Sequence, residues 1–213
     1  MSAYPCHNLP FTIQEIYSQL FERYGTQHWW PGESHDEIII GAILTQNTNW
    51  SNVSKAISNL KKANACDLKS CAEMDTELLE ELIKPSGFFR IKAKRLQQAS
   101  IEILKLSEKK HTLHEFRKEL LSIHGIGPET ADSILLYAFE LPVFVIDAYT
   151  KRIFSRMGKT TEKSTYHEIQ EIFHHSLPLD IALFNEYHAL IVRHAKEVCR
   201  KKPDCEHCIW STR

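Results

Sequence analysis

Asp147 is an acidic residue whose sequence surroundings suit a catalytic carboxylate. It directly follows four apolar residues, Val143 to Ile146, so its carboxylate stands at the edge of a buried segment. A carboxylate in a partly apolar cleft can activate water or stabilise a cationic sugar. The same position suits an N-cap for a helix beginning at Ala148. Asp147 is therefore a candidate for a catalytic role, a capping role or both.

A second informative segment contains Gly125 and Gly127 on either side of Ile126. Glycines at this spacing between two helical patterns allow a tight turn with exposed backbone N–H groups. Pro128 suits the first turn of the second helix, where no backbone donor is needed. Such a turn can bind phosphate without reading bases. Taken alone, the pattern also fits an ordinary helix–helix turn.

The six cysteines form one C-terminal group and three scattered positions. Cys199, Cys205 and Cys208 fall within ten residues. We expect no secretion signal at the start of the chain, so this group indicates metal ligation rather than disulfides. The other three are expected to be free thiols: Cys6, Cys66 and Cys71.

Hydrophobic spacing predicts helices along most of the chain. Thr12 suits the N-cap of a first helix ending at Gly25, and residues 34–37 fit a capping box. Propensity would allow a strand over Ile38 to Ile40, but the capping signal favours a buried helix. Further helices are predicted over about 78–83, 90–106, 131–138 and 181–198.

Length and composition set wider limits. The chain has 213 residues, 43% of them hydrophobic, which is enough for one large or two small domains. The longest uncharged apolar run, Ile38 to Leu44, is too short to span a membrane. A net charge of −1 excludes a uniformly basic DNA-binding protein. Basic residues gather over 84–95 and 193–202, which permits a local phosphate-binding face.

Together the hairpin and Asp147, twenty residues after Gly127, resemble the helix–hairpin–helix DNA glycosylases of the endonuclease III superfamily. Residues 44–48, 85–94 and 188–199 resemble further segments of that family in the same order. The resemblance implies an all-α, two-lobed fold with a central cleft. Its central lobe would span 28–141, and its second lobe would join 1–27 to 142–213.

The resemblance also implies a reaction. Asp147 would activate water and stabilise positive charge on the sugar of the damaged nucleotide. Bifunctional members attack the sugar with a lysine placed two residues after the second hairpin glycine. That position is Glu129 here, and a carboxylate cannot form a Schiff base. The resemblance therefore implies a monofunctional DNA glycosylase, although Glu129 is also an acid favoured in a first helical turn.

Three segments look most like the bacterial 3-methyladenine DNA glycosylase branch: residues 28–31, residues 44–50 and residues 125–132. That likeness implies an aromatic, carboxylate-lined pocket for an alkylated purine flipped out of the duplex. The alternative for the tryptophans is core packing. The implied base-pocket residues are Trp29, Trp30, Pro31, Trp50 and Glu129.

The expected partner is double-stranded DNA containing a damaged base, bound by a cytoplasmic monomer without membrane contact. Gln46 and Phe88 match the family positions that fill the gap left by the flipped base, and an aromatic wedge at Phe88 is chemically reasonable. Phe89 could exchange roles with Phe88. The other expected DNA contacts are Lys92, Gly125, Ile126 and Gly127.

The cysteine spacing departs from the superfamily's iron–sulfur loop, which has six, two and five residues between four cysteines. Here five residues separate Cys199 from Cys205 and two separate Cys205 from Cys208, and a fourth cysteine would fall at position 214. Three states stay open. They are a [4Fe–4S] cluster with three cysteine ligands and a non-cysteine fourth, a zinc site completed by a histidine such as His207, and an empty loop, since the methyladenine branch can lack a cluster. Residues 200–202 are basic and would touch phosphate in each case.

Two other functions stay open. One is an endonuclease III-like glycosylase and AP lyase acting on oxidised pyrimidines, against which the missing lysine argues. The other is a non-enzymatic hairpin protein that binds DNA. The combination of Asp147 with aromatic pocket candidates argues against it.

Overall fold

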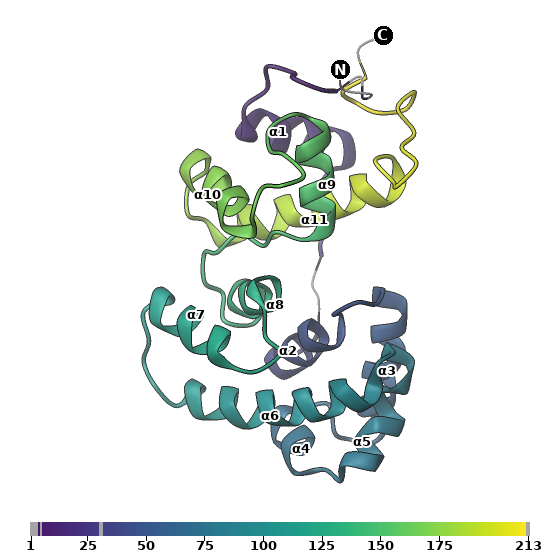
Figure 1. The fold of residues 1–213 in the computed structure, drawn as a ribbon, viewed down its shortest axis with the longest axis vertical. Helices are drawn as coiled ribbons and strands as arrows, with labels where there is room; N and C mark the ends of the chain where they lie inside the picture. The colour runs from purple at the N-terminus through teal and green to yellow at the C-terminus, as the bar shows by residue number, and fades with distance from the viewer. Residues whose placement is uncertain (1–3, 5, 30–31, 212–213) are drawn as a thin grey trace. The chain divides into compact units, whose positions relative to one another are not determined.

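A computed structural model describes residues 4, 6–29 and 32–211, and every regular element in these ranges is a helix (Figure 1). The prediction of an all-α chain is therefore confirmed. The chain divides into two compact units, one of residues 1–29 and 142–213, the other of residues 30–141. Among the described residues, no helix combines the length and apolarity needed to cross a membrane.

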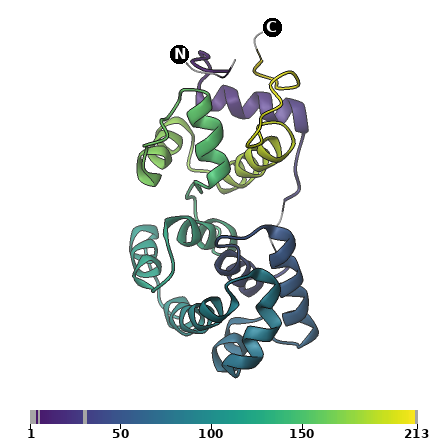
Figure 2. The same ribbon diagram turned by 45° about the vertical axis from the view of Figure 1, so that its right-hand side comes forward.

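The first unit is built around an aromatic core. Helix α11 packs against α1 and α9 within it (Figure 2). The rings of Phe144 and Phe173 stack 3.9 Å apart, and Phe184 meets Phe144 edge-on at 5.3 Å. Each of these three rings is fully buried, so they form the centre of the unit's apolar core. Its helices in the described ranges are α1 (Ile13–Tyr24), α9 (Ala148–Arg156), α10 (Tyr166–Ser176) and α11 (Ile181–Glu197).

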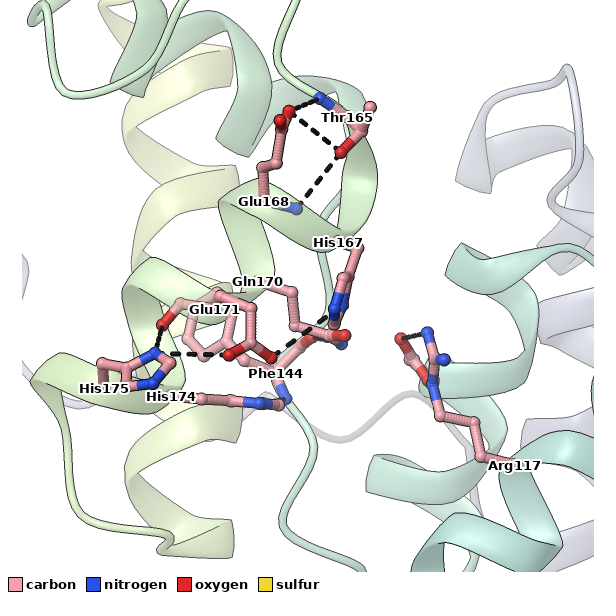
Figure 3. Close-up of polar contacts among 10 residues, drawn as sticks. Arg117, Phe144, Thr165, His167, Glu168, Gln170, Glu171, His174 and His175 are labelled. Carbon is pink, nitrogen blue, oxygen red and sulfur yellow. Dashed lines mark hydrogen bonds and ion pairs between the residues drawn. The ribbon is translucent and has the colours of Figure 1, made fainter.

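An extended segment, residues 141–147, leads into α9, and no strand pairs with it in the part of the chain that the structure describes. Its backbone groups therefore need side-chain partners. Helix α10 provides them: the Phe144 N–H donates to His174 Nε2 at 3.0 Å, and Gln170 Nε2 donates to the Phe144 carbonyl at 2.7 Å (Figure 3). A capping box between Thr165 and Glu168 fixes the start of α10. These contacts set the path of the chain towards Asp147.

The second unit contains the hairpin. In it α6 packs against α4 and α5, and α2 packs against α3 and η2. Residues 38–40 are buried in α2, so the predicted helix is confirmed. The elements described here are α2 (His35–Leu44), α3 (Trp50–Lys62), α4 (Leu68–Glu73), α5 (Thr76–Ile83), η1 (Lys84–Ser86), α6 (Phe89–Ser107), α7 (Leu113–Ser122), α8 (Pro128–Ser133) and η2 (Ile134–Ala138).

Two local predictions need correction. The capping box expected at residues 34–37 is only half formed: Ser34 accepts from the Glu37 N–H, but the Glu37 carboxylate accepts from the Glu33 N–H instead. The single helix expected over 131–138 divides into α8 and the π-helical turn η2. Neither difference alters the glycine hairpin, because residues 125–127 lie before α8 and far from residues 34–37 in the sequence.

Replacing Gln170 with methionine tests the support given by α10. The Phe144 carbonyl would lose its buried amide donor, so we expect the free energy of unfolding to fall by about 1–3 kcal/mol. Gln98→Met, on an exposed face of α6, is the matched control and should stay within about 0.5 kcal/mol. Urea unfolding measures both, and equal losses would contradict this account.

Candidate active site and nucleic-acid interface

Asp147 is the N-cap of α9, and its side chain is almost wholly buried at 8% residue exposure. Oδ1 accepts hydrogen bonds from the Thr150 N–H at 2.7 Å and from the Thr150 hydroxyl at 2.8 Å. Oδ2 lies 3.5 Å from His188 Nε2. Capping thus uses one carboxylate oxygen, and the other lies beside an imidazole.

The surroundings of Asp147 favour its ionised form. Burial by itself would raise the pKa of the Asp147 carboxyl. The attraction of His188 and the hydrogen bonds from Thr150 outweigh this effect, so the pKa lies below its ordinary value. The group is therefore a carboxylate at neutral pH, the state needed to stabilise a cation or to accept a proton from water.

His188 is a site residue that sequence analysis did not identify. It lies on α11 with 5% of its surface exposed, and its ring stacks on Trp29 with centroids 5.4 Å apart. The first unit thereby brings Trp29, His188 and Asp147 together. The available signal was a histidine on an otherwise apolar helix face. Trp30 and Pro31 lie outside the described residues.

The hairpin connects α7 to α8, and its two glycines differ. Gly125 has a φ of +90°, and a Cβ there would lie 2.8 Å from Arg95 Cδ. Gly127 caps α8 with φ −94°, and nothing would meet its Cβ within 4 Å. Gly125 is thus required by backbone shape and close approach. Gly127 instead leaves the N-terminus of α8 open.

Ile126 does not present the expected contact groups. Its side chain is 6% exposed, and its N–H donates to the Ile123 carbonyl at 3.0 Å. The prediction that it contacts DNA therefore does not fit the geometry of its side chain or amide. Ile126 instead anchors the turn in the core of the second unit.

Two polar links hold the hairpin in place. Arg117 on α7 forms a paired contact with Asp132 on α8, with Nε–Oδ1 at 2.6 Å and Nη2–Oδ2 at 3.0 Å. Gln46 Nε2 donates to the Gly125 carbonyl at 2.9 Å and to the Thr130 hydroxyl at 3.1 Å. Paired Arg–carboxylate geometry is strong and directional. Gln46 thus belongs to the hairpin's support.

Phe88 is an exposed aromatic residue in a strained backbone conformation. It has a φ of +48° and is 68% exposed, immediately before α6. A bulky residue in this left-handed region is uncommon, and such strain clusters at functional sites. Phe88 borders a surface hollow of about 180 Å³ that Gln46 also lines. The structure thus brings these two predicted residues to one surface.

Lys92 does not fit its predicted contact with DNA. Its side chain is 3% exposed, and Nζ donates to the carbonyls of Leu44 and Ser86, each at 2.8 Å. Burial lowers the pKa of its ammonium group. Lys92 therefore links the end of α2 to η1 from within and exposes almost no surface to a phosphate.

Trp50 and Glu129 are both accessible. Trp50 begins α3 and is 42% exposed, with its ring directed at Gly41 of α2. Glu129 is exposed at the second position of α8. Core packing therefore does not account for Trp50. Both side chains reach the surface of the second unit.

The C-terminal cysteines follow α11. Cys199 is buried, while Cys205 and Cys208 are half-buried. No three Cys, His, Asp or Glu side chains in the described ranges are arranged to hold a metal ion. His207 is exposed, and its Nδ1 lies 3.0 Å from the Asp204 carboxylate. Its neighbour is thus a carboxylate rather than a thiol.

A fourth thiol, which sequence analysis placed among the scattered ones, lies at this loop. Cys6 lines the same small hollow as Cys199, Cys205 and Cys208. Burial raises the pKa of the Cys6 thiol to about 11, and the nearby Cys208 and Cys199 add to the increase. The donor set available here is therefore four thiols, as many as a [4Fe–4S] cluster uses.

Residues 40–178, which include the hairpin and Asp147, match the HhH-GPD superfamily of base excision DNA repair proteins. The chain belongs to this superfamily. It is a DNA glycosylase of the base excision repair class by that membership.

Similar proteins span the chain. A protein of Methanocaldococcus jannaschii, provisionally described as a DNA repair glycosylase, is 50% identical and covers 92% of both chains. Endonuclease III of Thermotoga maritima is 28% identical, over 92% of this chain and 89% of its own. The structure of Helicobacter pylori 3-methyladenine DNA glycosylase bound to 1,N6-ethenoadenine aligns with a TM-score of 0.73, at 30% identity, covering 88% of this chain and 98% of the other. A trapped endonuclease III–DNA intermediate aligns at 0.80, covering 94% of each chain; at 20% identity it supports the fold.

Substituting alanine for each hairpin glycine in turn compares a strained, crowded position, Gly125, with an unstrained, open one, Gly127. Gly125→Ala should lower the free energy of unfolding by about 1–3 kcal/mol, because the backbone at this position is left-handed and the added Cβ would be crowded by Arg95. Gly127→Ala should cost less than about 1 kcal/mol, since its backbone is extended and its surroundings are open. Thermal or urea unfolding compares them. A larger loss at Gly127 would contradict the hairpin geometry.

Proposed function

We propose that this protein is a monofunctional DNA glycosylase that releases alkylated purines, such as 3-methyladenine, from double-stranded DNA. One observation carries the proposal: the Asp147 carboxylate is buried against Thr150 and His188, while the position where a lyase needs lysine holds Glu129. The first residue supplies the group needed for hydrolysis. The second removes the amine needed for a Schiff base.

Asp147 is the catalytic residue in this proposal. As the bond from C1′ to the base breaks, the electron pair leaves with the base and the sugar becomes cationic. The Asp147 carboxylate stabilises that cation and accepts a proton from the water whose oxygen bonds to C1′. His188 acts as a positioning residue, because its contact with Oδ2 keeps the carboxylate ionised and oriented.

Alkylated purines are suited to the proposed base-binding residues. Such bases are electron-poor and often cationic, and they stack favourably on indole rings. Trp50 exposes its indole, Trp29 is half-buried beside His188, and Glu129 supplies negative charge. Trp30 and Pro31 join this set on the sequence alone. The 30%-identical Helicobacter pylori glycosylase, solved with an adenine adduct, supports a purine substrate.

The second unit is proposed to bind the backbone of the DNA strand. The open Gly127 turn at the start of α8 would approach a phosphate, and Phe88 would insert where the damaged nucleotide leaves the stack. The exposure and backbone strain of Phe88 support that role. Gln46 would act from the adjoining turn, which its bonds to the hairpin hold in place.

Asp147→Asn tests the catalytic assignment without removing the cap, because asparagine caps helices as well as aspartate. We expect the single-turnover rate of base release from alkylated DNA to fall by about 10²–10⁴-fold, with DNA affinity and stability retained. Asp180→Asn is a matched control, since Asp180 caps α11 in the same unit from an exposed position. It should keep the wild-type rate. Full activity of Asp147→Asn would sink the assignment.

Phe88→Ala tests the wedge. Loss of the ring should reduce base release by about tenfold, because stacking on an aromatic side chain contributes about 1–3 kcal/mol. Leu78→Ala, which removes an exposed apolar side chain from α5, controls for surface hydrophobicity. Fluorescence of a base analogue opposite the lesion would report unstacking. Unchanged flipping and release in Phe88→Ala would exclude the wedge.

A further inference from the structure

The segment that carries Cys6 and the loop of residues 199–208 lie side by side in the first unit. Cys6 lies close to the C-terminal loop although more than 190 residues separate it from Cys199. Both thiols are 8% exposed, and they share one hollow with Cys205 and Cys208. All six cysteines of the chain are free of disulfides. Four of them therefore gather as thiols.

Specific contacts hold Cys6 at this point. Its Sγ lies 3.9 Å from the carbonyl of Arg156, the last residue of α9, and His7 Nδ1 lies 3.3 Å from the same oxygen. The Asn8 N–H donates to the Met157 carbonyl at 3.0 Å. The segment carrying Cys6 is thus attached to the end of α9 by consecutive residues.

Arg156 also contacts the C-terminal loop. Its Nη1 donates to Cys199 Sγ at 3.2 Å and to the Arg200 carbonyl at 2.7 Å, and Nη2 donates to the Lys201 carbonyl at 3.0 Å. Arg156 is only 9% exposed. A buried guanidinium is costly unless negative charge lies nearby. Thiolates bound to a metal would provide that charge, and N–H donors to sulfur are typical of the surroundings of thiolate centres.

We infer that Cys6 is the fourth ligand of a four-thiolate metal centre completed by Cys199, Cys205 and Cys208. The chemistry suits a [4Fe–4S] cluster or a zinc ion, both of which take four cysteines. The hollow among the thiols is small, so loading requires the thiols to turn towards it. Cys205 and Cys208 lie in a non-helical loop that can make this adjustment. The inference does not depend on the glycosylase reaction.

Metal analysis of the full chain, purified without oxygen, tests the inference. The wild type and Cys66→Ser should hold equal metal, since Cys66 lies in the other unit. The metal content of Cys6→Ser and of Cys205→Ser should each be lower by about fivefold or more. Iron with acid-labile sulfide and visible charge-transfer absorption identifies a cluster, whereas colourless zinc identifies a single ion; loss of either from Cys6→Ser supports the inference. Wild-type protein without metal, or Cys6→Ser with its full content, would overturn it. The latter result would leave His194, whose Nε2 is 3.8 Å from Cys208 Sγ, as the completing side chain.

A second measurement covers the case in which Cys6→Ser fails to fold. Native wild-type protein is alkylated before and after chelation of its metal, and each cysteine is followed by mass spectrometry. Modification of Cys6 and Cys205 should rise together by about tenfold or more on metal removal. Cys71, fully buried in the other unit, should not change. An unchanged rate at Cys6 while Cys205 responds would contradict the inference.

Discussion

The buried carboxylate of Asp147 is the constraint on which the first unit depends. Removing a charge from water is costly, and this charge is retained because Thr150 and His188 contact its two oxygens. The contacts with Thr150 fix the start of α9, and the contact with His188 fixes which face of α11 lies beside Asp147. The aromatic core and the Gln170 contact then fix the extended segment that ends at Asp147. The helix cap and the proposed catalytic carboxylate are thus the same side chain.

Helix α9 connects Asp147 to the cysteine cluster of the first unit. Asp147 stands at its N-terminus, and the carbonyl and guanidinium of its last residue, Arg156, contact Cys6 and Cys199. A metal centre at that end would stabilise the fold by closing the N-terminal segment onto the C-terminal loop. It would act on catalysis only by holding α9 in place. The second unit has its own organising contact, the Arg117–Asp132 pair across the hairpin.

Local patterns were predictable from the sequence, and long-range pairings were not. The glycine hairpin, the Asp147 cap and the buried face of α11 all follow from spacing within a few residues. The contact of His188 with Asp147 joins residues 41 positions apart, and no local rule specifies it. For Lys92 a local pattern was misleading. Its basic neighbours suggested a contact with DNA at the surface, but its ammonium group is buried and donates to the carbonyls of Leu44 and Ser86. Cys6 lacked any spacing signal because the fold alone brings it to Cys199.

The central claim is hydrolysis of an alkylated purine without strand cleavage, and one assay of products tests it most directly. Methylated duplex DNA is incubated with the protein, the released bases are separated by chromatography, and the strands are examined on a denaturing gel before and after alkali. We predict free 3-methyladenine, intact strands without alkali, and breaks only after alkali. Strand breaks without alkali, or release of oxidised pyrimidines alone, would contradict the account.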